Sequence, residues 1–182
     1  MTTTRERALI AAVRLVGEQG VRALTHARVD AEAGLPKGST SNWFRTRDAL
    51  VSGVVSWIAE LERADLAAAV APARTREDVV DAFCRLLENL TGRDAVRTRA
   101  RYALFFEMTA SPDAHAPLRA QRSEFEAWTR DLLAGLGAQH PDTAARAFLA
   151  FAAGLIVNRL TVDPAAPLRP IVATALQGCL DA

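Results

Sequence analysis

The sequence has few residues of the kinds that build covalent or metal-stabilised sites. It contains only two cysteines, Cys84 and Cys179, and three histidines, His26, His115 and His140. Two isolated cysteines do not form a disulfide framework and fit a reducing compartment, although a redox-sensing pair is an alternative. The histidines are scattered, and HExxH, paired-cysteine, phosphate-loop and Gly-x-Ser-x-Gly motifs are all lacking. We therefore expect a protein that is not an enzyme and that uses no metal or cofactor.

Long apolar runs and an apolar leader segment are lacking as well. No stretch approaches the roughly 18 uncharged apolar residues that a membrane-spanning helix needs. The N-terminal residues MTTTRERAL are polar and do not resemble a signal peptide. These absences predict a cytoplasmic protein without membrane contact.

Aromatic and β-branched runs are few, whereas alanine is abundant and 50% of the residues are hydrophobic. This composition favours α-helix. A chain of 182 residues with this apolar content can bury a substantial core, in one domain or in two small domains that share a helix. We expect an all-α fold.

The net charge of +1 does not by itself indicate nucleic-acid binding, but its distribution along the chain is uneven. Between Val21 and Arg47, five cations stand against two acids, which is a local excess of three positive charges. Lys37 is the only lysine of the chain. The cations are Arg22, Arg28, Lys37, Arg45 and Arg47, and the acids are Asp30 and Glu32.

The stretch 25–44, THARVDAEAGLPKGSTSNWF, predicts two short helices joined by a tight corner. Thr25 can cap the first helix, and Gly34 can end it in the left-handed conformation. Leu35 is expected to fill the angle between the helices. Pro36 has the fixed φ that suits the first turn of the second helix, so we expect that helix to begin there.

The second helix of the pair carries small, polar or cationic side chains from Lys37 to Asn42, and Trp43 and Phe44 are expected to anchor its far end. Small side chains allow close approach, while hydroxyl, amide and ammonium groups can contact base edges and phosphates. Such a helix suits the DNA major groove. An ordinary surface helix followed by a loop is the alternative that spacing alone leaves open.

The order of features over residues 5–50 resembles the TetR family of bacterial transcriptional regulators. These features are a first helix, Gly20, Thr25, VDAEAGLPKGS, WF and TRDAL. The resemblance implies about nine helices, with an N-terminal three-helix helix-turn-helix DNA-binding domain over 1–50. It also implies a C-terminal helical domain for effector binding and dimerisation over 51–182. The chain departs from the commonest form of the motif at Pro36, Ser41, Asn42 and Trp43, and an aromatic ring is missing at Ser41.

The residues predicted to contact DNA lie in both short helices and at the start of the next helix. Arg47 is included because the resemblance implies a phosphate-binding cation at its position. The set is Thr25, His26, Arg28, Lys37, Gly38, Ser39, Thr40, Ser41, Asn42, Trp43 and Arg47.

Capping residues and apolar spacing predict the other helices. Thr3 and Glu6 form a possible capping box for a helix that ends near residue 18 and buries Ile10 on its apolar face. Asp142 is expected to cap a later helix. The further ranges are 46–70, 75–92, 94–109, 118–136, 142–162 and 171–180, and in the range 94–109 the expected solvated residues are Arg97, Arg99 and Arg101.

The segment 142–162 is apolar almost all round, and it is uncharged between Phe148 and Val157. It is either the central helix of a monomer or a helix that packs on its own subunit and on a second copy. With the segment 171–180 it could form a four-helix bundle across a two-fold axis. The resemblance favours this homodimer, because family members usually dimerise through their last two long helices.

Aromatic residues of the C-terminal region predict an apolar chamber for a small-molecule effector. Tyr102 and Phe106 share a helix face, and the amide of Asn158 needs a partner in its apolar surroundings. Plain core packing is the alternative for each of these residues. The candidates are Phe83, Leu87, Tyr102, Phe106, Phe125, Trp128 and Asn158.

The resemblance implies a ligand-responsive regulator, most often a repressor, that binds a palindromic operator in double-stranded DNA as a homodimer. A small apolar effector would favour a dimer shape that does not fit the operator. The alternative is a protein-interaction module with the same fold and no sequence-specific DNA binding.

Overall fold

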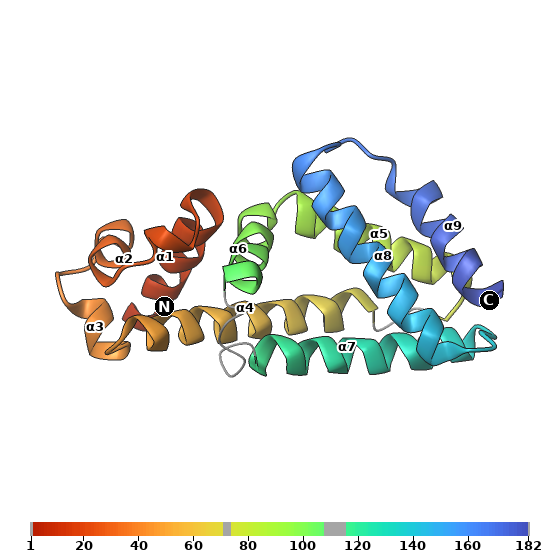
Figure 1. Cartoon of the computed structure of the whole chain (residues 1–182), viewed down its shortest axis with the longest axis horizontal. Coiled ribbons are helices and arrows are strands. Elements are labelled where there is room, and N and C mark those ends of the chain that lie inside the picture. The colour runs from red at the N-terminus through yellow and green to blue at the C-terminus, as the bar shows by residue number, and fades with distance from the viewer. Residues whose placement is uncertain (1, 71–73, 108–115, 182) are drawn as a thin grey trace. The chain divides into compact units, whose positions relative to one another are not determined.

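The computed structural model describes residues 2–70, 74–107 and 116–181. These residues form nine α-helices and one short 3-10 helix, without a strand, which confirms the all-α prediction (Figure 1). The chain divides into two compact units, one of residues 1–62 and 96–119 and the other of residues 63–95 and 120–182. Helix α4 (Arg47–Val70) contributes residues to both units. The functional boundary predicted after residue 50 stays a prediction.

The first unit contains α1 (Thr4–Gln19), the 3-10 helix η1 (Val21–Ala23), α2 (His26–Glu32), α3 (Ser39–Trp43), part of α4 and most of α6 (Ala95–Glu107). The capping box of α1 is formed as predicted: the Thr3 hydroxyl accepts the Glu6 N–H, and the Glu6 carboxylate accepts the Thr3 N–H at 2.7 Å.

A single hydrophobic core joins α1, α2, α4 and α6 within this unit. Leu9, Leu50, Ile58 and Leu104 are fully buried in it, and Leu35 packs against it from the corner between α2 and α3, as predicted. The prediction that Ile10 is buried is wrong, because its side chain is 50% exposed. Small residues at 8, 11 and 12 complete the buried stripe of α1, and this stripe leaves Ile10 on the outer side.

Helix α6 also corrects an expectation about its arginines. Arg99 is exposed, but Arg97 and Arg101 are half-buried rather than solvated. Arg101 Nη1 lies 3.1 Å from Glu62 Oε2, and Glu62 is only 6% exposed. Ala100 and Leu104 of the same helix belong to the core, so the arginines beside them lie close to apolar surface. Long cationic side chains bury their aliphatic part along such a surface.

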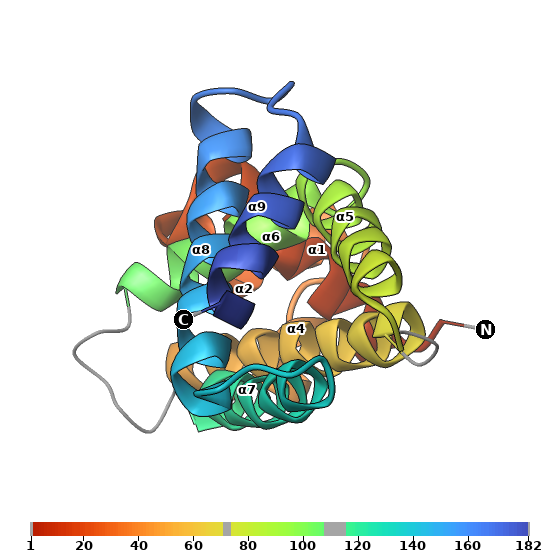
Figure 2. The same cartoon turned by 90° about the vertical axis from the view of Figure 1, so that its right-hand side faces the viewer.

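The second unit contains α5 (Arg76–Thr91), most of α7 (Ala116–Gly135), α8 (Pro141–Thr161) and α9 (Leu168–Asp181). Helices α5, α8 and α9 pack against one another, and Figure 2 shows them as neighbours. Thr75, the first residue of the predicted range 75–92, caps α5 and forms a capping box with Asp78. Asp142 does not cap α8, because Pro141 already occupies its first turn and His140 takes the cap position. The predicted end of α6 at residue 109 lies outside the described residues.

Helix α8 is apolar on both of its sides. Its buried residues include Phe148, Leu149, Leu155 and Ile156. Its outward side carries exposed small or apolar residues at 147, 150, 154 and 157. Among the described residues, α8 is the one helix long and apolar enough to cross a membrane, with 39% of its apolar window buried. The core helix of a soluble protein can have the same length and apolar composition, so these two properties alone do not make α8 a membrane span.

Replacing Gly17 by alanine should destabilise the first unit. A Cβ atom at Gly17 would lie 2.1 Å from the backbone oxygen of Val96, so α1 or α6 would have to shift. We expect Gly17→Ala to lower the free energy of unfolding by about 1–3 kcal/mol, measured by urea denaturation. Gly135→Ala is the matched control, because a Cβ there meets nothing within 4 Å. Equal stability of Gly17→Ala and the wild type would contradict the close contact of α1 and α6.

Candidate nucleic-acid interface and effector site

Helix α2 begins and ends as the sequence predicts. The Thr25 hydroxyl accepts the N–H of Arg28 at its start, and Gly34 adopts a φ of 60° just beyond its end. A side chain from α1 completes this end, because Arg7 Nη2 donates to the backbone oxygens of Ala33 at 2.8 Å and Gly34 at 3.2 Å. The sequence analysis did not identify this role of Arg7, which depends on a contact between residues far apart in sequence.

Helix α3 begins at Ser39 rather than at Pro36, which corrects the predicted start. Gly38 occupies the N-cap position with a φ of 88°. Pro36 lies in the corner instead, where its backbone oxygen accepts the Ser39 N–H at 3.1 Å and the Ser39 hydroxyl at 2.7 Å. A turn therefore forms before the helix, and Gly38 provides the left-handed backbone that this turn requires.

The carboxylate of Asp30, on α2, caps the start of α3. Its Oδ2 accepts the N–H of Gly38 at 2.8 Å, and its Oδ1 accepts the N–H and the hydroxyl of Thr40 at 2.8 Å and 2.5 Å. Asp30 is 2% exposed and Thr40 is fully buried. Burial acts to raise the pKa of Asp30, but the hydrogen bonds from Thr40 and Gly38 outweigh it and hold that pKa below the ordinary value of an aspartic acid. The carboxylate is therefore ionised at neutral pH.

This arrangement corrects the expectation that Thr40 offers its hydroxyl to DNA. The hydroxyl already donates to Asp30, and the side chain has no exposed surface. From the sequence, Asp30 was considered only as one of the two acids between Val21 and Arg47, and its capping role was not predicted. One signal was available in the sequence: the residue before Ser39 is a glycine, and a glycine N-cap leaves the first turn of a helix without a side-chain acceptor.

Lys37, just before α3, and the side chains on the outer side of α3 are open to solvent, whereas Ser39 at its start is half-buried. Lys37, Ser41 and Asn42 are exposed, and Trp43 is 56% exposed. The expectation that Trp43 anchors the end of α3 is therefore wrong. Phe44 alone takes that role, because it is 6% exposed and belongs to the core.

The remaining candidates for DNA contact make hydrogen bonds within the first unit. His26 Nε2 lies 2.6 Å from the backbone oxygen of Phe44, so this nitrogen carries the proton and donates it. Arg28 donates to the side chain of Gln19, and Arg47 Nη2 lies 3.4 Å from the backbone oxygen of Val21. Arg28 and Arg47 are nevertheless exposed. Each can hold its intramolecular bond and still present charge to solvent.

The predicted effector residues fall in both compact units. Tyr102 and Phe106 belong to the first unit, where their rings stack with centroids 6.5 Å apart and Phe106 is 71% exposed. The other candidates belong to the second unit and are Phe83, Leu87, Phe125, Trp128 and Asn158.

In the second unit the rings of Phe83, Phe125 and Trp128 form an aromatic cluster. Their centroids are 5.7–6.3 Å apart, and their planes lie within 12–24° of parallel. Phe148 of α8 meets Phe83 edge to face at 4.6 Å. Asn158 is half-buried farther along α8. All three rings of this cluster are among the predicted effector residues, whereas Phe148 is not.

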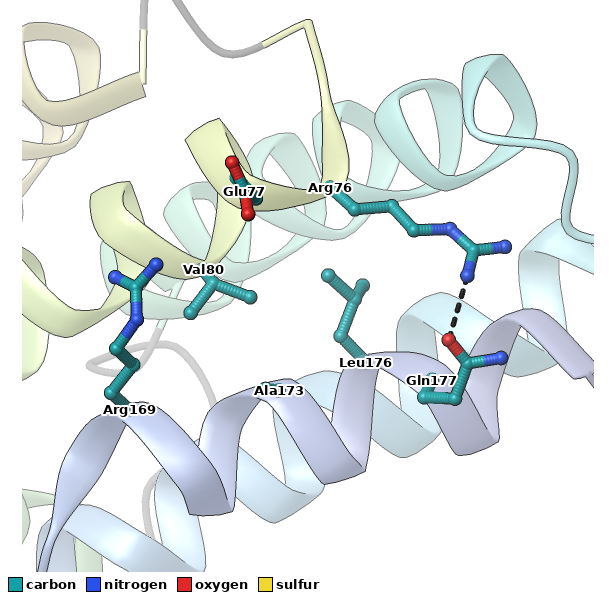
Figure 3. Close-up of a pocket in the computed structure, with 7 residues that line it drawn as sticks. All are labelled: Arg76, Glu77, Val80, Arg169, Ala173, Leu176 and Gln177. Atoms are coloured by element: carbon teal, nitrogen blue, oxygen red, sulfur yellow. Dashed lines mark hydrogen bonds between the residues drawn. The ribbon is translucent and has the colours of Figure 1, made fainter.

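The second unit also has a surface groove between α5 and α9 that the sequence analysis did not identify (Figure 3). Its volume is about 220 Å³. Arg76 reaches across one end and donates to the side chain of Gln177 at 2.6 Å, while Arg169 bonds Asp81 at the other end. The groove is lined by Arg76, Glu77, Val80, Arg169, Ala173, Leu176 and Gln177.

Solved structures similar to this chain share its helical architecture. A member of the TetR family (SCO1917) from Streptomyces coelicolor A3 has a TM-score of 0.75 at 27% identity, with 97% of this chain and 98% of that chain covered. The TetR-family transcriptional regulator SCO4454 from Streptomyces coelicolor has a TM-score of 0.81 at 21% identity, with 98% and 94% covered. The multidrug binding protein EbrR complexed with ethidium has a TM-score of 0.68 at 28% identity, with 97% of each chain covered.

No curated protein matches this sequence. The model of one family, described as the tetracyclin repressor-like C-terminal domain, matches residues 74–182. That match covers more than half of the chain, and it includes the five helices from α5 to α9. The chain therefore belongs to the tetracyclin repressor-like (TetR) family of transcriptional regulators.

Proposed function

We propose that this protein is a ligand-responsive transcriptional repressor that binds a palindromic operator as a homodimer and is released by a small apolar effector. The observation that supports this function best is the two-sided character of α3. Its inner side is fixed to α2 through Thr40, whereas its outer residues Ser41, Asn42 and Trp43 are open to solvent. Lys37, just before the helix, is exposed as well. A fixed helix with exposed amide, hydroxyl and ammonium groups can enter the major groove and contact base edges and phosphates.

The proposed dimer uses the outward sides of α8 and α9. Exposed positions 147, 150, 154 and 157 of α8 are alanine, alanine, glycine and valine, and they recur at helical spacing. Small side chains at this spacing allow a second helix to approach closely. A two-fold dimer would present two copies of α3, which must lie about 34–36 Å apart to read two half-sites on one face of DNA.

The proposed effector is a planar aromatic compound that binds in the second unit. Phe83, Phe125 and Trp128 already stack on one another, and an aromatic ligand can replace part of this stacking with its own ring faces. EbrR was crystallised with the aromatic dyes proflavin and ethidium. The chain of the proflavin complex is 27% identical to this chain, and that of the ethidium complex is 28% identical. Leu87 and Asn158, which belong to the same unit, remain proposed contacts.

In the proposed mechanism, the effector and the operator favour different shapes of the dimer. The effector shifts the population only by the difference between its affinities for the two shapes. Helix α4 contributes residues to both compact units, so it is the element through which a change in the second unit would reach α3.

A binding selection on random duplex DNA tests the proposed function. We expect the purified protein, unfolded and refolded free of ligand, to enrich an inverted repeat whose affinity falls steeply with salt. Lys37→Ala should weaken binding and reduce the slope of log affinity against log salt by about 1, because one phosphate contact is lost. Arg93→Gln removes the same charge from an exposed turn of the second unit and should change neither. Failure of the refolded wild type to enrich any sequence would contradict DNA recognition and favour a protein-interaction module.

A charge on the outward side of α8 should separate the dimer. We expect Val157→Glu, at a residue that is 40% exposed, to raise the dissociation constant of the dimer at least about 100-fold, because the charge would be buried without a partner. Light scattering after gel filtration should then give the monomer mass of 19.6 kDa, against twice that mass for the wild type. Ser123→Glu, on an exposed position of α7, is the matched control. A dimer that survives Val157→Glu would exclude this interface.

Removing one ring of the aromatic cluster should weaken the binding of planar dyes. We expect Trp128→Ala to reduce the affinity for proflavin about tenfold, because stacking surface is lost. Fluorescence anisotropy of the dye with protein alone measures this, since proflavin also binds DNA. Trp57→Phe, at a partly buried residue that packs against the core of the first unit, should leave the affinity unchanged. Equal affinities of Trp128→Ala and the wild type would place the effector elsewhere.

A further inference from the structure

Helix α3 cannot hold its own position. It has only five residues, and an isolated helix of that length is unstable in water. Its N-cap is Gly38, which has no side chain to accept the free N–H groups of the first turn. The orientation of α3 must therefore come from contacts with the rest of the first unit.

Asp30 supplies these contacts with both of its carboxylate oxygens. The N–H groups of Gly38 and Thr40 are each 2.8 Å from a different oxygen, so the carboxylate fixes two points of the α3 backbone. The Thr40 hydroxyl adds a third bond and fixes the rotation of α3 about its axis, because it turns residue 40 toward α2. Hydrogen bonds to an ionised acceptor are shorter and stronger than those between neutral groups.

We propose that Asp30 is a positioning residue for DNA recognition, whose carboxylate sets the orientation in which α3 presents Lys37, Ser41, Asn42 and Trp43 to the major groove. This inference rests on the proposed DNA-binding function. It assigns a role in recognition to a buried acid on α2 that itself does not contact DNA.

The positioning role of Asp30 and the repulsion between its charge and DNA phosphates have opposite effects on DNA affinity, so a substitution can separate them. A carboxylate near the DNA-facing helix repels phosphates, so loss of its charge alone should strengthen DNA binding. Loss of its hydrogen bonds should instead weaken binding, because α3 would no longer be fixed. The amide of asparagine has nearly the same shape, but its NH₂ group cannot accept a bond, so one N–H of α3 would be left without an acceptor.

The test compares Asp30→Asn with Glu32→Gln. Glu32 lies two residues away on the same helix, is exposed and pairs with Arg14 at 3.3 Å, so its substitution removes the same charge without touching α3. We expect Asp30→Asn to lower the affinity for the selected operator about tenfold or more. Glu32→Gln should leave the affinity unchanged or raise it. Binding is measured near neutral pH, at a temperature where circular dichroism reports each variant as fully folded.

Amide hydrogen exchange gives a second readout that needs no DNA. In Asp30→Asn the N–H groups of Gly38 and Thr40 should exchange faster, while the N–H groups within α1 keep their protection. Thr40→Val removes only the hydroxyl bond and should weaken operator binding less than Asp30→Asn. Combining the two substitutions should cost less than the sum of the single losses, because both act on one network.

Two failures are distinguishable. If the wild type binds the operator and folded Asp30→Asn binds as tightly as Glu32→Gln, the positioning role of Asp30 is overturned while the proposed function stands. If the refolded wild type binds no DNA, the proposed function is overturned and the recognition role of Asp30 with it.

Discussion

The ionised carboxylate of Asp30 and its three hydrogen bonds determine how the N-terminal helices are arranged. Two further side chains act in the same way at other helix ends: Arg7 donates to the last backbone oxygens of the α2 region, and His26 donates to Phe44 at the end of α3. Helices of seven and five residues have few internal bonds, so a large share of their backbone groups lies at their ends. The geometry of this helix pair is therefore set by polar bonds between residues far apart in sequence, added to an apolar core.

The sequence predicts those features that depend on near neighbours. The Thr3–Glu6 capping box, the Thr25 cap and the left-handed Gly34 each involve residues within a few positions, and the structure has all of them. The errors concern contacts over longer separations. The side of α3 that faces inward depends on the bond of Thr40 to a residue ten positions earlier, and the exposure of Ile10 depends on which stripe of α1 the other helices cover. Residue type and spacing do not identify the residue that bonds Thr40 or the helices that cover α1.

The second unit shows the same limit for apolar residues. The sequence indicates that α8 is apolar on most sides, and the structure divides these sides into a buried side against α5 and α9 and an exposed side of small residues. Aromatic spacing likewise named Phe83, Phe125 and Trp128 but also Tyr102 and Phe106, which belong to the other compact unit. Hydrophobic periodicity identifies residues that prefer burial. It does not identify which of them share one cluster.

The residues that hold α3 in place differ from those that it exposes to solvent. Lys37, Ser41, Asn42 and Trp43 make no side-chain hydrogen bond to any other described residue, whereas the bonds that hold the helix are made by Asp30, Gly38 and Thr40. Substitutions at the four outer positions therefore change the free energy of folding little. In the proposed DNA-binding function, substitutions at these positions can change which DNA sequence is recognised while the scaffold of α2 and α3 stays intact.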